Sequence, residues 1–320
     1  MRRIAKIEVA AANAGIPVAE FLATRFTYHS REEWTAQIDS GAITVNGAAV
    51  RPEDPLAAGA VLEYAPPAVP EPPADLSYTV LADDPDFIIV DKSGNLPCHP
   101  AGRYFRHTLW ALLKERQRID TPVFVHRLDR ETSGVVVVAK NATTARALSA
   151  QFERREIRKE YLAMVEGEFP QQLNAEGWLC PDTVSAIRKK RRFVLGETPP
   201  CPNAEPAATV FRREAFAGGI SLVRAIPHTG RTHQIRATLY SLGFPVVGDK
   251  LYGRDESCFL RQLEGRLTDA DRRALRLDRQ ALHSALLRFR HPRNNNEVTA
   301  TAPAPTSWHS VMPIGINNEH

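Results

Sequence analysis

The sequence contains only four cysteines in 320 residues, and no pair has the C-x-x-C spacing of a zinc site or a redox motif. We therefore expect no bound metal, no disulfide framework and a reducing compartment. No apolar run is long enough to cross a bilayer. The polar residues Lys6, Glu8 and Asn13 interrupt the N-terminal segment and argue against a secretory signal. These absences predict a cytoplasmic protein with no membrane partner.

The chain also lacks a strong excess of charge of either sign. It has 41 lysines and arginines against 37 aspartates and glutamates, so its formal net charge of +4 is weak evidence for nucleic acid. The cations are concentrated locally, with five in succession at Arg188–Arg192 and four within Arg154–Lys159. A single run of this kind is usually a solvated surface. Two runs near other polar motifs favour a polyanionic partner.

The length suggests about two domains. The segment "PPAVPEPPAD", residues 66–75, is half proline and predicts a semi-rigid linker between a small module, residues 1–65, and a large body, residues 76–320. In the small module, Ser30 with Glu33 three residues later predicts a capped helix. Asn46-Gly47 predicts a hairpin turn between short strands. We expect a small α/β module here.

The body mixes strands and helices without a regular β-α-β alternation, which favours an α+β fold over a doubly wound one. Short runs rich in β-branched residues predict buried strands, and apolar stripes at helical spacing predict helices. The expected strands are 86–92, 134–140 and 160–167, and the expected helices are 107–117, 141–155, 232–243 and 267–277.

The segment "VHRLDRETSG" crowds charged residues against the apolar run Val135–Val138. Asp129 lies between Arg127 and Arg130, and nearby cations lower the pKa of a carboxyl group. Such a carboxylate can act as a nucleophile or an electrostatic stabiliser, although a salt bridge in a loop is the simpler alternative. The position at a strand end favours a functional site. A kinase catalytic loop is excluded because Leu128 interrupts H-R-D and no glycine-rich loop precedes it.

A second cluster extends from Pro227 to Gly253. Arg231 and Arg236 flank the start of the helix expected at 232–243, where an anion is favoured. His228 and His233 have no acidic or cysteine partner at ligand spacing, so hydrogen bonding is a better interpretation than metal binding. The segment "VVGDKLYG" alone indicates only packing. Tyr161, in an expected strand, either packs in the core or stacks on a base, and its local sequence does not decide between these roles.

Together these segments resemble the RluA family of RNA pseudouridine synthases. "HRLDRETSGVVVVAK" and "TGRTHQIR…LGFPVVGDKLYG" carry the resemblance, with weaker support from "DDPDFIIVDKSGNLPCHP" and "ALHSALLRFRHP". The chain departs from the family at Ser93, Thr238 and Ser284, which replace a usual proline, histidine and alanine. The small module resembles an S-four-type RNA-binding domain through "SREEWTAQIDSGAITVNG".

The resemblance implies a mixed, mainly antiparallel sheet with flanking helices and a central cleft. It also implies that Asp129 is the essential aspartate, paired with Arg236, and that Tyr161 stacks on the uracil. Arg127 would help to displace the target nucleotide, and Leu282 would line the pocket. We assign further RNA contacts to His126, Arg130, Arg231, His233, Arg188, Lys189 and Lys190.

The chemistry of uridine isomerisation fits these residues. No electrons are exchanged and no phosphate energy is needed, so we expect no cofactor and no metal. The aspartate could attack the sugar carbon, add to the uracil ring or remove a sugar proton, and the sequence leaves these routes open. The expected partner is structured RNA, with ribosomal RNA of the large subunit favoured over transfer RNA. A non-catalytic RNA-binding assembly factor and a metal-dependent hydrolase are the alternatives. We take a monomer as the default.

Overall fold

A computed structural model describes residues 4–26, 29–65 and 70–312 of the chain. The chain divides into two compact units, Met1–Pro72 and Pro73–His320. Residues 66–69 of the expected linker lie outside the described residues, and residues 70–75 form no helix or strand. Among the described residues, no helix has both the length and the apolar composition needed to span a membrane.

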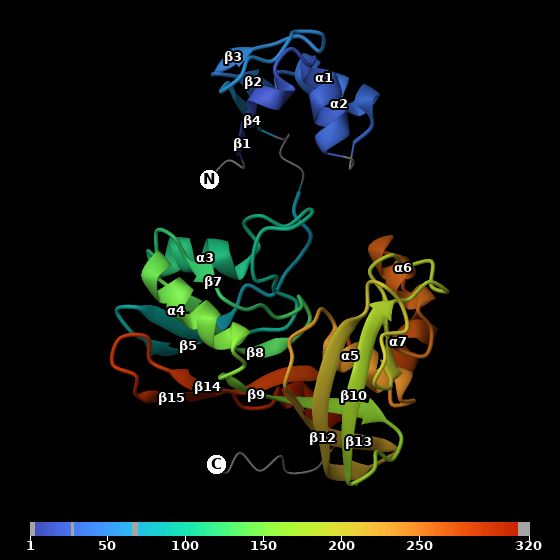
Figure 1. Cartoon of the computed structure of the whole chain (residues 1–320). Helices are drawn as coiled ribbons and strands as arrows, with labels where there is room; N and C mark the ends of the chain where they lie inside the picture. The colour runs from blue at the N-terminus through green and yellow to red at the C-terminus, as the bar shows by residue number, and fades with distance from the viewer. Residues whose placement is uncertain (1–3, 27–28, 66–69, 313–320) are drawn as a thin grey trace. The chain divides into compact units, whose positions relative to one another are not determined.

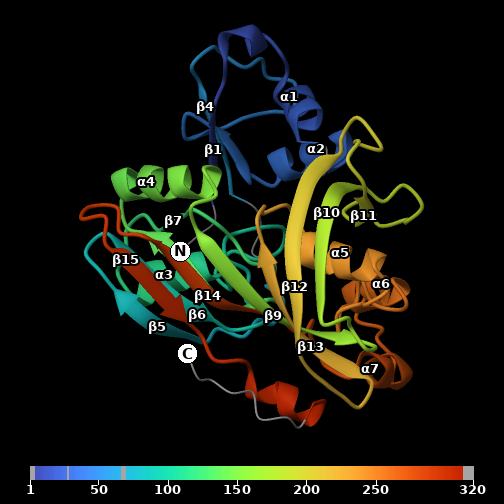
Figure 2. The same cartoon turned by 60° about the horizontal axis from the view of Figure 1, so that its bottom comes forward.

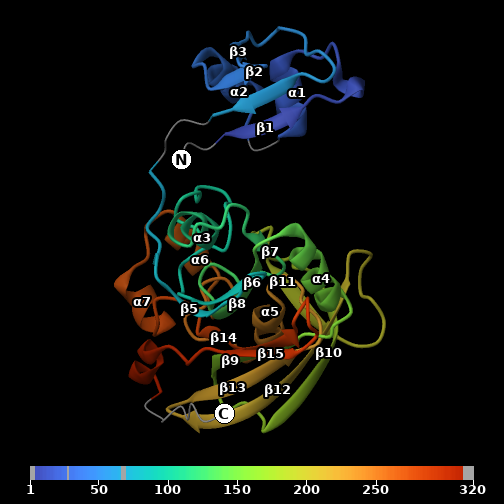
Figure 3. The ribbon, with the colours of Figure 1, turned by 90° about the vertical axis from the view of Figure 1, so that its left-hand side faces the viewer.

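The N-terminal unit is a four-stranded antiparallel sheet, in the order β1-β4-β2-β3, with two α-helices (Figure 3). Its elements are β1 (Ala5–Glu8), η1 (Ala11–Asn13), α1 (Val18–Arg25), α2 (Arg31–Asp39), β2 (Ile43–Val45), β3 (Ala48–Ala49) and β4 (Val61–Tyr64). The expected capping box is present, because Ser30 accepts from the Glu33 N–H at 3.2 Å and the Glu33 carboxylate accepts from the Ser30 N–H at 2.7 Å. The turn at Asn46-Gly47 has φ of 52° and 79°, as the hairpin prediction requires.

The C-terminal unit is built on an eleven-stranded sheet (Figure 1). Its main path runs β11-β10-β12-β13-β9-β14-β8-β6-β5, with β15 paired to β14 and β7 paired to β8. The strands are β5 (Tyr78–Asp83), β6 (Phe87–Lys92), β7 (Val123–Phe124), β8 (Ser133–Ala139), β9 (Arg158–Glu166), β10 (Gln172–Pro181), β11 (Arg191–Leu195), β12 (Glu205–Ala217), β13 (Ile220–Pro227), β14 (Leu282–Arg290) and β15 (Glu297–Thr301).

Every described strand pair in this sheet is antiparallel except β8 with β14. The helices are α3 (Leu109–Arg116), α4 (Ala142–Glu153), α5 (Gln234–Ser241), α6 (Ser257–Leu263), α7 (Asp269–Leu275) and η2 (Thr306–Ser310). In Figure 2, α3 and α4 lie beside the part of the sheet that contains β5 and β6, and α5, α6 and α7 lie beside the part that contains β10–β13. The predicted α+β fold with a mainly antiparallel sheet and flanking helices is confirmed.

Strand β8 is buried on both faces, which explains its uninterrupted apolar run. Val136 and Val138 pack with the α3 leucines, whereas Val135 and Val137 pack with the α4 residues Ala145 and Leu148. Successive residues of a strand point to opposite faces, so the two helices cover opposite sides of this strand. The charged segment that precedes β8 is therefore mounted on a strand fixed from both sides.

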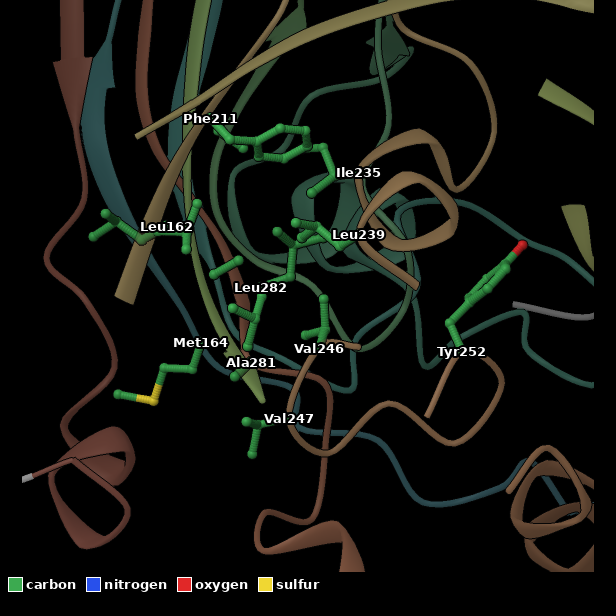
Figure 4. Packing of buried hydrophobic residues seen from close by; sticks show 14 of the residues in the cluster. Leu162, Met164, Phe211, Ile235, Leu239, Val246, Val247, Tyr252, Ala281 and Leu282 are labelled. Atoms are coloured by element: carbon green, nitrogen blue, oxygen red, sulfur yellow. The ribbon is translucent and has the colours of Figure 1, made fainter. Parts of the chain in front are cut away.

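Helix α5 is anchored in the core beside the same sheet. Ile235 and Leu239 are buried and belong to the same hydrophobic cluster as Leu282 of β14 and Phe211 of β12 (Figure 4). Ile235 and Leu239 lie one helical turn apart, and this apolar stripe was expected from the sequence. It fixes the rotation of α5 and hence the direction in which its polar residues project.

Candidate active site

The loop between β7 and β8 carries Asp129 and is held by a buried lysine. The Lys92 ammonium, which is 0% exposed, donates to the carbonyls of Ser93 at 2.8 Å, Leu96 at 2.9 Å and Arg130 at 3.3 Å. Burial lowers the pKa of Lys92 to about 8. Because these carbonyls belong to two separate loops, the lysine ties both loops to the end of β6.

Asp129 forms an ion pair with a residue far away in the sequence. Arg236 donates from Nη1 to Asp129 Oδ2 at 2.6 Å, and His233 Nε2 lies 3.9 Å from Asp129 Oδ1. Burial acts to raise the pKa of Asp129, but neighbouring groups, with the charge of Arg236 the largest, hold the pKa below its usual value. The Asp129 side chain is nevertheless 27% exposed. The site therefore presents an ionised carboxylate that a ligand can reach.

Asp249 fixes the guanidinium of Arg236 from the other side. Its side chain is 0% exposed, and its two oxygens accept from Arg236 Nε at 2.6 Å and Nη2 at 2.9 Å. Asp249 Oδ1 also accepts from the N–H groups of Leu251 and Tyr252, each at 2.9 Å. Burial acts to lower the pKa of Arg236, but Asp249 and Asp129 raise it above its ordinary value. The bidentate pair leaves Nη1 free to point at Asp129.

His233 lies at the start of α5 in a left-handed conformation, with φ of 58°. Its Nδ1 is 2.9 Å from the Tyr252 hydroxyl, and the Arg236 guanidinium lies 5.0 Å from the centre of the Tyr252 ring. Burial, reinforced by the charge of Arg236, lowers the pKa of His233 to about 4. The imidazole beside Asp129 is therefore neutral near pH 7 and contributes a hydrogen-bonding group, not a second positive charge.

Asp129 faces a cavity of about 110 Å³, named here the small pocket. Tyr161 of β9 and Leu282 of β14 form part of its apolar wall. Burial raises the pKa of Tyr161 to about 12, so the phenol is neutral. Seven of the residues predicted from the sequence line this pocket: Arg127, Asp129, Tyr161, Arg231, His233, Arg236 and Leu282. Lys159 also lines the pocket and was not predicted from the sequence, because nothing in its basic run distinguishes the one side chain that turns inward.

A second cavity of about 410 Å³, the large cleft, adjoins the small pocket and shares Asp129 and Arg236 with it. Two further predicted residues lie here. Arg130 donates to the Tyr104 hydroxyl at 2.8 Å, and the Lys189 ammonium lies 4.0 Å from the centre of the Phe259 ring. Aromatic rings beside cations suit nucleobases and phosphates together.

Comparison with known proteins places this arrangement in a family. A family model described as RNA pseudouridylate synthase matches residues 86–241. Ribosomal large subunit pseudouridine synthase D of Xylella fastidiosa is 35% identical over 301 residues, which cover 89% of this chain and 84% of that protein. The chain belongs to the RNA pseudouridylate synthase family.

Other members of the RNA pseudouridylate synthase family agree in sequence and in fold. Human pseudouridylate synthase RPUSD2 is 36% identical over 192 residues, but these are 60% of this chain and 33% of that protein, so the chain spans about a third of it. The solved structure of human RNA pseudouridylate synthase domain containing 1 aligns with a TM-score of 0.56 and 26% identity, covering 73% of this chain and 86% of that one.

Two residues predicted to contact RNA are turned away from both cavities in this member of the family. His126 Nε2 accepts from the Val137 N–H at 3.1 Å, and its ring stacks on Phe152 with centres 4.9 Å apart. The Lys190 side chain is 4% exposed and its ammonium is 2.6 Å from Glu256. Both placements depart from the predicted RNA contacts, because charge and position in the sequence do not specify which way a side chain points. Arg188, by contrast, is exposed but lines neither cavity.

We expect His126→Ala to destabilise the protein without removing its activity. The substitution leaves the Val137 N–H without its acceptor inside the protein, which costs about 1–3 kcal/mol. Urea unfolding measures the loss, and activity is measured under conditions in which the variant is folded. His309→Ala, at an exposed histidine, is the matched control with an unchanged unfolding midpoint. A large loss of activity at unchanged stability would contradict the structural role.

Two groups of possible metal ligands occur among the described residues. They are Asp84, Asp86 and His291, and Asp255, Cys258 and Asp271. An arginine already occupies each group, since Arg293 Nη2 donates to Asp86 at 2.7 Å and Arg261 Nη2 donates to Asp271 at 2.6 Å. Each set therefore already has a carboxylate paired with an arginine, and neither set of residues lines the cavities beside Asp129.

Proposed function

We propose that this chain is an RNA pseudouridine synthase that converts specific uridines of structured RNA to pseudouridine. The observation that carries the proposal is the ionised, partly exposed Asp129, which lines a pocket with Tyr161 and is held at 2.6 Å by Arg236. Relatives from Xylella fastidiosa and Yersinia pestis are named as large-subunit ribosomal enzymes. This supports ribosomal RNA as the target, with transfer RNA as the alternative.

The reaction has a simple balance of atoms. The bond from N1 of uracil to C1′ of ribose breaks, a bond from C5 to C1′ forms, C5 loses its proton and N1 gains one. The product is therefore an isomer, and the balance requires no oxidant and no phosphate donor. An ionised Asp129 can start the reaction by attack on the sugar, addition to the ring or removal of a sugar proton. All three routes need the carboxylate in its charged form, which the Arg236 pair maintains.

The target nucleotide must leave its stack before it reaches Asp129. Extrusion of a base costs a few kcal/mol. Stacking on Tyr161 would return about 1–3 kcal/mol, and contacts between the RNA phosphates and cations around the pocket would offset the remainder. Arg127 is exposed at the border of the small pocket and the large cleft, where it can occupy the position that the extruded nucleotide vacates.

The N-terminal unit is proposed to act as an S-four-type RNA-binding domain. Support comes from the resemblance of residues 30–47 and from the compactness of the unit, which has its own core around Trp34 and Leu22. A second RNA-binding unit beside the catalytic one would strengthen binding to an RNA whose fold presents both contact sites, which favours a structured target over a single-stranded RNA. Deleting residues 1–72 and comparing folded with denatured RNA tests this role, because only binding to the folded RNA should weaken.

Tritium release tests the enzymatic proposal directly. The purified chain is incubated with unmodified large-subunit ribosomal RNA carrying tritium at uridine C5, because that hydrogen leaves in the reaction. We expect release, and pseudouridine at one or a few positions. Release from transfer RNA alone would assign the alternative target. RNA binding without release from either RNA would favour a non-catalytic assembly factor.

We expect the ring of Tyr161, and not its hydroxyl, to matter for turnover. Tyr161→Phe keeps the stacking surface and should retain most of the activity, because the phenol is neutral with a pKa of about 12. Tyr161→Ala should lose about 1–3 kcal/mol of stacking, roughly 5-fold to more than 100-fold in kcat/KM. Steady-state kinetics on the same RNA compare the two variants. Equal losses in both would assign the effect to the hydroxyl and contradict the stacking role.

A further inference from the structure

A third cavity, of about 340 Å³, opens beside the small pocket and is strongly basic. It is named here the basic groove, and its polar lining includes the cations Arg155, Arg158, Lys159 and Arg212, with His228. Lys159 and Pro227 line both the basic groove and the small pocket. Lys159 therefore stands at the boundary between the two.

The fold assembles the basic groove from segments that are far apart in the sequence. After α4, the chain turns through Arg155, whose φ is 60°, and enters β9 at Arg158. Arg212 lies on β12, and β13 stands between β12 and β9 in the sheet. Cations from the α4–β9 corner and from β12 thus converge across three neighbouring strands. This convergence distinguishes the groove from a basic run that is merely solvated along one segment.

The positive charge of the groove is largely uncompensated. Four cations line it against a single carboxylate, that of Glu156. Arg158 is partly neutralised by Glu160 at 2.6 Å, and the Lys159 ammonium donates to the carbonyl of Thr229 at 3.3 Å. Arg155 and Arg212 are exposed, and neither forms an ion pair with any residue in the described ranges.

A groove lined by several unpaired cations is suited to bind a polymer with regularly spaced negative charges, such as the backbone of RNA. We propose that the basic groove binds the phosphodiester backbone of the RNA segment on one side of the target uridine, with Lys159 at the phosphate nearest the small pocket. This inference rests on the proposed function. An extruded nucleotide in the small pocket brings its neighbouring phosphates to the pocket boundary, which is where Lys159 lies. An acidic protein segment would lack that reason to lie against the pocket.

Salt dependence of RNA binding tests the groove. The probe is a fluorescent oligouridine of about 20 nucleotides, titrated with the full chain between about 50 and 200 mM salt. Each phosphate contact on a single strand contributes roughly 0.7 to the slope of log affinity against log salt concentration. The variant Arg155→Gln/Arg212→Gln should therefore reduce the magnitude of the slope by about 1.4. An unchanged slope would overturn the proposal.

A control with the same change in charge separates the groove from net charge. Arg272→Gln/Arg273→Gln removes two exposed cations from α7 and should leave the slope near that of the unmodified chain. Equal reductions in both variants would overturn the proposal. Arg212→Glu, a single change on an exposed strand position, keeps the test available if the double variant does not fold. Arg212→Glu should reduce the magnitude of the slope by at least the roughly 0.7 expected for one phosphate contact.

Salt dependence and competition together distinguish this inference from the proposed function and from a protein partner. The salt slope is measured on binding alone, without turnover, so failure to find isomerase activity would leave the groove result standing. Polyglutamate of matched charge should compete poorly with oligouridine. Equal competition would overturn the proposal in favour of an acidic protein segment.

Discussion

Replacing Arg236 with methionine should abolish isomerisation and lower the free energy of unfolding by about 3–5 kcal/mol. The guanidinium lies between Asp129 and Asp249, and the Asp249 side chain is 0% exposed. Without Arg236, the Asp249 charge stays buried without its partner, and the pKa of Asp129 loses the main influence that keeps it low. Urea unfolding and tritium release measure the two losses on the same preparation.

A second substitution separates the two effects. In Arg236→Met/Asp249→Asn the buried charge is removed, while the amide oxygen still accepts from the N–H groups of Leu251 and Tyr252. We expect a substantial part of the stability to return but none of the activity, because Asp129 still lacks its partner. Arg236→Lys is a stricter comparison, since an ammonium cannot form the bidentate pair and also reach Asp129. Activity in Arg236→Met/Asp249→Asn would contradict the role assigned to Arg236. If Arg236→Met were as stable as Arg236→Met/Asp249→Asn, the role assigned to Asp249 would be wrong.

The sequence predicted the composition of the site better than its geometry. Local charge suggested that Arg127 and Arg130 hold Asp129 ionised. Arg127 does contribute to the low pKa of Asp129, but Arg130 bonds to Tyr104, and the largest lowering comes from Arg236, 107 residues later. The resemblance to a family suggested that distant pair, because a family motif carries information about contacts across the fold. The charges of neighbouring residues carry no such information.

Asp249 could not have been found from local pattern. It follows Gly248 in a segment whose composition indicated only packing, and its function depends on a turn that brings it against α5. The same limit applies to His126 and Lys190, which are charged or polar yet serve the interior of the protein. In each case the direction of the side chain is set by tertiary packing.

Some strands could be predicted from the sequence and others could not. Strand β8 was predicted because burial on both faces leaves a continuous run of β-branched residues, Val135–Val138. The long strand β12 was not predicted, although it covers 13 residues. Its buried positions are only Ala207, Thr209 and Phe211, and they are followed by the charged run Arg212–Glu214, so its apolar signal is weak. Its pairing with β10 and β13, together with the burial of Phe211, stabilises it as a strand.

Asp129→Asn should reduce isomerisation by about 10⁴-fold, the upper end of what one positioned acid or base contributes. The amide has the shape of the carboxylate, and its oxygen can still accept from Arg236 Nη1, so folding and RNA binding should persist. What disappears is the negative charge that each possible route requires. Asp120→Asn, at an exposed aspartate, is the control and should keep full activity.

The most direct test is single-turnover tritium release from one uridine-labelled ribosomal RNA, with the unmodified chain and Asp129→Asn compared at equal RNA occupancy. The account predicts release by the unmodified chain and none above background by the variant, although both bind the RNA equally. Release by Asp129→Asn at a comparable rate would show that the carboxylate beside Arg236 does not carry the reaction.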